Sequence, residues 1–136
     1  MTDPTPNPNP VDMELIQLLA EAAWARKARN IVAFDVRKTV FYTDAMIVCT
    51  GTSDRHVRAV AEALEGAAAE AGLSAPTTEG RTHGRWILQD FGSVTVHVFH
   101  EFLREMYDLE RLFGDAPRIP LTLKADPTDN EGWDEE

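Results

Sequence analysis

Gly51, Thr52, Ser53 and Asp54 are consecutive residues between an apolar stretch and an amphipathic stretch, where a strand is expected to lead into a helix. The backbone N–H groups at a helix start attract anions, so a turn of this kind is able to hold a phosphate group. The turn lacks the further glycines of a P-loop or of a dinucleotide-binding motif. A plain helix cap by Ser53 or Asp54 explains the same residues, and the sequence leaves both interpretations open.

A strand, a Gly-Ser turn and a helix in this order are also typical of the nucleotidyltransferase fold. Enzymes of that fold hold Mg²⁺ with paired carboxylates on a neighbouring strand, because the metal neutralises charge on the transferring phosphoryl group. None of the acidic pairs spaced by two residues falls on a predicted strand: Asp12/Glu14, Asp108/Glu110, Asp129/Glu131 and Asp134/Glu136. The sequence therefore predicts neither a catalytic metal site nor a cofactor.

His97 and His100 form an H-x-x-H pair at the end of the last predicted strand. On a continuing strand their side chains point to opposite faces, which favours one histidine inside the sheet and one at its rim over a zinc site. Ser53, His97 and an aspartate do not indicate a catalytic triad, because the chain has no G-x-S-x-G elbow. Cys49 lies within an apolar stretch and is predicted to be a small core residue.

Trp86 begins a predicted strand beside a glycine-rich link, and Asp90 and Phe91 follow it in a predicted hairpin. Tyr107 lies on the last predicted helix. Aromatic side chains next to charged ones at the rim of a sheet have the composition of a protein–protein hot spot. The alternative is that Trp86 covers the core, and the sequence does not decide between the two.

The elements expected to position these residues alternate between helices and strands. Asp12 is a suitable cap for the first helix, and Gly72 is a suitable stop for the second. Residues 31–36 and 45–50 are almost continuously apolar, which predicts strands buried on both faces. The expected order is helix 12–28, strands 31–36 and 45–50, helix 54–71, an extended piece 77–79, strands 85–89 and 94–99, and helix 101–113. This order predicts an α/β (α+β) fold, a mixed sheet of about five strands with helices packed on it.

The composition divides the chain into three parts. Four prolines among the first ten residues predict a disordered proline-rich arm over residues 1–11, and the acidic residues 124–136 predict a disordered tail. Residues 12–123 are then one small domain. The net charge is −10 and no basic face is evident, which argues against a sequence-specific nucleic-acid binder. The acidic surface either aids solubility or attracts a basic partner.

The environment expected for the chain is the cytoplasm. Its single cysteine rules out an internal disulfide and is compatible with a reducing compartment. The sequence contains neither a secretory signal nor an apolar run long enough to span a bilayer, which predicts a soluble protein without a membrane partner.

Three blocks of the sequence, in a fixed order, form a distinctive set. The first comprises residues 35–36 and TDAMIVCTGTSDRHV at 43–57. The second comprises residues 79–80, Trp86, Asp90, Gly92 and VHVFHE at 96–101. The third comprises Arg104, Tyr107, LERL at 109–112 and GDAP at 114–117. Together these blocks resemble the ribosomal silencing factors of the Iojap-like family, and the resemblance covers roughly residues 13–118.

The resemblance implies a nucleotidyltransferase-like fold without the catalytic carboxylates, and a regulator of translation that is not an enzyme. Such a factor binds the large ribosomal subunit through large-subunit ribosomal protein fourteen. It then blocks subunit joining and represses translation when nutrients are limiting. The contacts carried over by position are Trp86, Asp90, Phe91, Glu101, Tyr107 and Glu110, and Phe113 stands where many members have Trp.

Two alternatives remain beside this interpretation. A divergent nucleotidyltransferase-like or phosphate-binding enzyme would use the Gly51–Asp54 turn, although the missing carboxylates argue against it. A homodimer is compatible with silencing, and the sequence does not decide the oligomeric state.

Overall fold

The computed structural model describes residues 11–106 and 115–123 of the chain. In this part of the chain three helices and five strands follow the predicted order. They are α1 (Met13–Ala25), β1 (Arg29–Asp35), β2 (Ala45–Gly51), α2 (Asp54–Glu70), β3 (Thr77–Glu79), β4 (Trp86–Asp90), β5 (Val94–His100) and α3 (Glu101–Met106). Residues 107–113 of the predicted last helix lie outside the described residues. No helix in the described ranges is long and apolar enough to cross a membrane.

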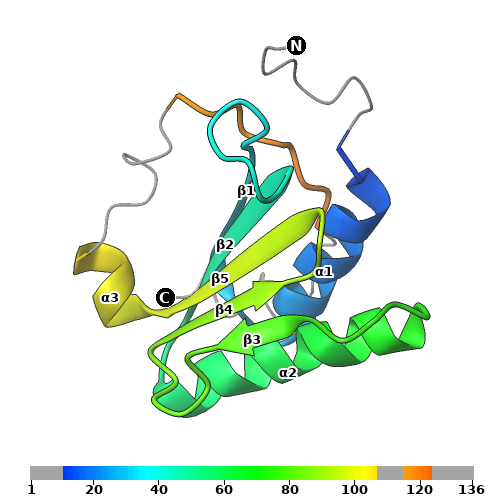
Figure 1. Ribbon diagram of the computed structural model, residues 1–136. Coiled ribbons are helices and arrows are strands. Elements are labelled where there is room, and N and C mark those ends of the chain that lie inside the picture. The colour runs from blue at the N-terminus through cyan, green and yellow to red at the C-terminus, as the bar shows by residue number, and fades with distance from the viewer. Residues whose placement is uncertain (1–10, 107–114, 124–136) are drawn as a thin grey trace.

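The five strands form a single mixed sheet in the order β1-β2-β5-β4-β3. β2 pairs with β5 in parallel, and the other neighbours are antiparallel. α1 and α2 pack side by side on one face of this sheet (Figure 1). The predicted fold class, a mixed sheet of about five strands with helices packed on it, is confirmed.

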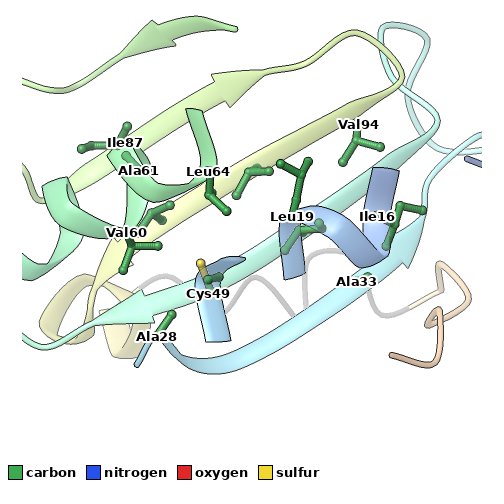
Figure 2. Close-up of a cluster of buried hydrophobic side chains, with 14 of the residues drawn as sticks. Ile16, Leu19, Ala28, Ala33, Cys49, Val60, Ala61, Leu64, Ile87 and Val94 are labelled. Carbon is green, nitrogen blue, oxygen red and sulfur yellow. The ribbon is translucent and has the colours of Figure 1, made fainter. Parts of the chain in front are cut away.

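The main core lies between α1, α2 and the sheet. The apolar stripe of α1 includes Ile16 and Leu19, and that of α2 includes Val60 and Leu64, all without exposed surface. These side chains meet Cys49 and other strand residues in the middle of the sheet (Figure 2). Spacing of three and four residues on each helix therefore produces the buried face that the sequence predicts.

β1 differs from the prediction of burial on two faces, whereas β2 follows it. Every residue of β2 is buried, but only Ala33 and Phe34 are buried in β1. The two strands differ because β2 is internal and β1 is an edge strand of the sheet. Residues beyond the sheet cover the outer edge of β1: Ile119 N–H donates to Ala33 O at 2.8 Å, and Asp35 N–H donates to Pro117 O at 2.8 Å.

The two long helices end in left-handed backbone conformations. α1 ends at Ala25, earlier than the predicted 28, because Lys27 adopts φ +68° and Ala28 N–H donates to Ala23 O at 3.0 Å. α2 ends at Glu70, and the predicted stop Gly72 has φ +83°. The basic residues after Ala25 therefore lie beyond α1, at the corner before β1.

Candidate functional site

Three aromatic rings gather on the sheet face opposite α1 and α2. Trp86 of β4 pairs with Phe99 of β5, and Leu88 pairs with His97. The rings of Trp86 and Phe99 are stacked with centroids 4.8 Å apart, and the His97 ring lies 6.0 Å from each. We call Trp86, His97 and Phe99 the aromatic cluster. Its position follows from strand alternation, which turns residues 97 and 99 away from the helix side that 96 and 98 face.

A hydrogen bond within the cluster orients Trp86. The indole Nε1–H donates to His97 Nδ1 at 3.1 Å, which places the proton of a neutral His97 ring on Nε2. Nε2 is buried and has no hydrogen-bond partner among the described residues. Burial lowers the pKa of His97 to about 4, so the ring is neutral at pH 7 and accepts from Trp86. The predicted arrangement of His97, hydrogen-bonded within the sheet, is confirmed.

Trp86 has structural features that fit each of the two roles that the sequence left open. Its ring covers Phe99, which has no exposed surface, so it contributes to the core on this face. At the same time Trp86 is 40 % exposed, more than a buried aromatic residue would be. A side chain that is packed on one side and open on the other is suited to anchor a partner without moving.

Asp90 and Phe91 lie at the far end of β4 from Trp86. Asp90 is exposed and alternates onto the same sheet face as Trp86, about 13 Å away along the strand. Its Oδ1 accepts the Gly92 N–H at 2.8 Å, which shapes the predicted hairpin. Phe91 is half-buried and packs against the helix-side core instead. The structure therefore places Asp90 on the face of the aromatic cluster and Phe91 away from it.

Glu101 and an additional residue, Phe102, lie at the start of α3, which directly follows β5. Both are exposed, Phe102 by 62 %. Phe102 borders a hollow of about 460 Å³ whose other lining residues are Asp54, Arg85, His100 and Leu103. Phe102 was not among the predicted contacts, although two apolar residues between Glu101 and Arg104 at a helix start were a usable signal. Tyr107 and Glu110 lie outside the described residues.

The Gly51–Asp54 turn serves as a helix cap. Ser53 Oγ accepts the His56 N–H at 3.0 Å, and His56 Nδ1 accepts the Thr52 N–H at 2.9 Å. The backbone N–H groups of His56 and Thr52, which a bound phosphate would need, therefore already donate to side chains of this turn. A side chain on Gly51 would approach Val57 Cγ2 to 2.7 Å, so the glycine is required for close packing against α2. The cap interpretation accounts for every feature of this turn.

The other groups considered for chemistry are separated. His97 lies with Trp86 on one face of the sheet, and Ser53 caps α2, which packs on the other face, so the two do not meet as members of a triad. Cys49 is fully buried, and burial raises the pKa of its thiol to about 12, which confirms a core residue. Within the described ranges, no three His, Cys, Asp or Glu side chains are grouped as metal ligands.

The comparisons with known proteins agree on one family. Residues 9–136 match the family described as ribosomal silencing factor during starvation. A ribosomal silencing factor from Halalkalibacterium halodurans is 39 % identical over 110 residues, which cover 81 % of this chain and 94 % of that protein. A mouse protein named for mitochondrial assembly of the ribosomal large subunit is 30 % identical over 101 residues, 72 % of this chain and 44 % of the mouse protein.

A solved structure agrees with the fold. A crystal structure of a Chromobacterium violaceum protein matches with a TM-score of 0.73 and 33 % sequence identity, covering 88 % of this chain and 98 % of that one. Sequence and fold thus agree over most of both chains, and the matched region includes both the sheet and the helices around it. The chain belongs to the ribosomal silencing factor family.

Proposed function

We propose that this chain binds the large ribosomal subunit through large-subunit ribosomal protein fourteen and thereby blocks subunit joining. Translation would be repressed in this way when nutrients are limiting, in the cytoplasm and without enzymatic activity. Family membership supports a silencing role, and the name of the mouse relative refers to the large subunit. The observation that carries the proposal is Trp86, which is held by Phe99 and His97 and still 40 % exposed.

The proposed contact surface centres on Trp86 and includes Glu101 and Phe102 at the start of α3. An aromatic anchor surrounded by polar groups is the usual centre of a protein interface. Acidic groups such as Glu101 complement a basic ribosomal protein and speed the encounter. Asp90 extends the surface along β4, and the predicted contacts Phe91, Tyr107 and Glu110 remain predictions.

Silencing of this kind needs no reaction, only occupied volume. A domain of this size can bury on the order of 800 Å² on its partner, which suffices for specific binding. The rest of the bound domain then fills space that the small subunit requires. The enzyme alternative at the Gly51–Asp54 turn gains no support from the described residues. A binding assay with Mg²⁺ and nucleotides tests it, because such an enzyme would bind a nucleotide.

Sucrose-gradient sedimentation of purified subunits tests the proposal. With excess protein, we expect fewer full ribosomes and comigration of the chain with the large subunit alone. Direct binding to isolated large-subunit ribosomal protein fourteen is the second expected result. Comigration with the small subunit, or unchanged subunit joining at excess protein, would refute the proposal.

A further inference from the structure

Basic residues from four separate stretches meet at one end of the sheet. The stretches are residues 26–30, 51–58, 79–86 and 97–104, and together they contain eight Arg or Lys against three Asp or Glu. We call this end the basic pole; its bases are Arg26, Lys27, Arg29, Arg55, Arg58, Arg81, Arg85 and Arg104. This surface is not evident from the sequence, because only the fold brings the four stretches together.

Strand pairing joins the first, second and fourth stretches. Arg29 at the start of β1 pairs with Thr50 near the end of β2, and Gly51 pairs with His100 at the end of β5. His100 N–H donates to Arg85 O at 2.7 Å, which adds the start of β4. Because β2 and β5 are parallel, both reach the same edge of the sheet. In Figure 1 this edge lies at the lower left, where α2 begins and α3 follows β5.

Hydrogen bonds from α2 fix two links that carry basic residues of the basic pole, the link between α1 and β1 and the link between β3 and β4. His56 Nε2 donates to Arg26 O at 2.7 Å, which ties the corner after α1 to the start of α2. Arg58 donates from Nε to Arg81 O at 3.0 Å and from Nη2 to Thr82 O at 2.7 Å, which ties down the link between β3 and β4. The basic residues are thus presented on a fixed framework.

The basic pole remains positive after its internal pairs are considered. Arg81 forms an ion pair with Glu65, and Arg104 donates to Thr50 Oγ1 at 2.7 Å. The residues with exposed positions include Arg26, Arg29, Arg55 and Arg85. The acidic residues in the four stretches are Asp54, Glu79 and Glu101. Bases therefore outnumber acids at this end.

We propose that the basic pole binds the phosphate backbone of ribosomal RNA, next to the protein contact made by Trp86. The inference rests on the proposed function, which brings the chain to a surface built of RNA and protein. Elsewhere in the described ranges, Arg and Lys occur only as Arg37, Lys38 and Arg118, and the net charge of the whole chain is −10. A cluster of arginines on such a chain complements a polyanion, and the guanidinium group fits phosphate oxygens.

The basic pole and the proposed protein contact are continuous. Arg85 directly precedes Trp86, and it lines the same hollow as Phe102. A single docking orientation can therefore bring both surfaces into contact. Phosphate contacts fix orientation and add affinity without reading sequence, which agrees with the absence of a base-reading motif.

Charge-neutralising variants test the inference on the full chain. Arg29→Gln and Arg55→Gln are chosen because both positions are exposed and neither adjoins Trp86. Lys38→Gln is the matched control: it removes one exposed positive charge outside the basic pole. Affinity is measured over a series of salt concentrations, for purified large subunits and for isolated large-subunit ribosomal protein fourteen, and melting temperature confirms folding.

The double variant Arg29→Gln/Arg55→Gln should bind large subunits on the order of tenfold more weakly. The slope of log affinity against log salt concentration should be less steep by about one for each phosphate that is no longer neutralised. Its affinity for isolated protein fourteen should match that of the unaltered chain, and Lys38→Gln should match it in both assays. Unchanged subunit affinity and salt slope would overturn the RNA contact. Equal losses toward subunits and isolated protein would overturn it in favour of a protein contact.

Failure of the proposed function gives a different result. If the unaltered chain binds large subunits but not protein fourteen, the proposed partner is wrong, while weaker subunit binding by the double variant still supports the basic pole. If the unaltered chain does not bind large subunits, both proposals fail.

Discussion

At the scale of single residues, Trp86 and His97 form a coupled pair. The Trp86 ring face packs on Phe99, and its N–H donates to His97, so the orientation of the indole is set by two neighbours. A fixed side chain loses little conformational freedom when a partner binds. The site therefore depends on residues behind Trp86 as well as on Trp86 itself.

Trp86→Ala should weaken binding to the large subunit by about 2 kcal/mol or more, a loss of about thirtyfold. Because the ring also covers Phe99, the free energy of unfolding should fall by about 2 kcal/mol, less than for a fully buried tryptophan. Denaturant unfolding and binding are measured on the same preparation. Leu73→Ala, at another exposed apolar position, is the control for both. Normal binding by the folded fraction of Trp86→Ala would remove this residue from the interface.

His97 predicts a specific pH dependence of stability. Its pKa is lowered by burial from 6.5 to about 4, so between these values the unfolded chain takes up a proton that the folded chain does not. The contribution of neutral His97 to stability is present above pH 6.5 and is lost as the pH falls toward 4, by about 3 kcal/mol in total.

Replacing His97 with Gln keeps an acceptor for Trp86 but removes the titration. Denaturant unfolding between pH 4 and pH 7.5 should therefore show a flatter stability profile for His97→Gln than for the unaltered chain. His83→Gln, in the exposed link between β3 and β4, should keep the original profile. Parallel profiles for both variants would show that other groups cause the pH dependence.

At the scale of elements, two glycines should respond in opposite ways to alanine. Gly80 has φ +90°, and a side chain there would collide with the Trp86 carbonyl oxygen, so Gly80→Ala should cost more than about 2 kcal/mol of stability. Gly66 lies within α2 with nothing within 4 Å of an added Cβ, so Gly66→Ala should stabilise by about 0.5–1 kcal/mol. Thermal unfolding of both variants checks the pair, and equal shifts would contradict it.

Local sequence signals account for most of the elements. Asp12 and Ser53 cap α1 and α2 as predicted, with their side chains accepting from Leu15 N–H and His56 N–H. The hairpin between β4 and β5 also forms where it is predicted, although Asp90 belongs to β4 and the connection is residues 91–93. Phe91 N–H donates to Val94 O at 2.9 Å. Caps and turns depend on a few adjacent residues, which explains why the sequence predicts them well.

Features that depend on distant neighbours were not predictable. The apolar pattern of β1 resembles that of β2, but its exposure follows from an edge position that only sheet order determines. The basic pole escaped prediction for the same reason, since its arginines come from four stretches. Trp86 was identified as a candidate, but the bond from its indole to His97 depends on strand pairing. The likeness to nucleotidyltransferases remains a prediction.

At the scale of the whole molecule, a chain truncated to residues 12–123 should unfold cooperatively and bind the large subunit. Residues 117–122 belong to the folded unit, because Ile119 is buried and Thr122 N–H donates to Gln17 Oε1 at 3.3 Å. Truncation at residue 114 is the matched control, and it should lower stability because it removes the buried Ile119 and leaves the outer edge of β1 uncovered. Circular dichroism melting and gradient sedimentation check both chains. Loss of cooperative unfolding in the 12–123 chain would show that an end belongs to the core.

The order of the strands also determines when the domain can form during synthesis. Of the strands that the structure describes, β5 is the last to be made, yet it lies in the centre of the sheet, between β2 and β4. Before residues 94–100 leave the ribosome, β2 can pair only with β1, and the backbone N–H and C=O groups on its other edge stay unpaired. Unpaired strand edges and exposed apolar side chains promote association between incomplete chains. A chain that stops before residue 94 therefore lacks the strand that joins both halves, whereas a chain that stops after residue 123 has the complete sheet.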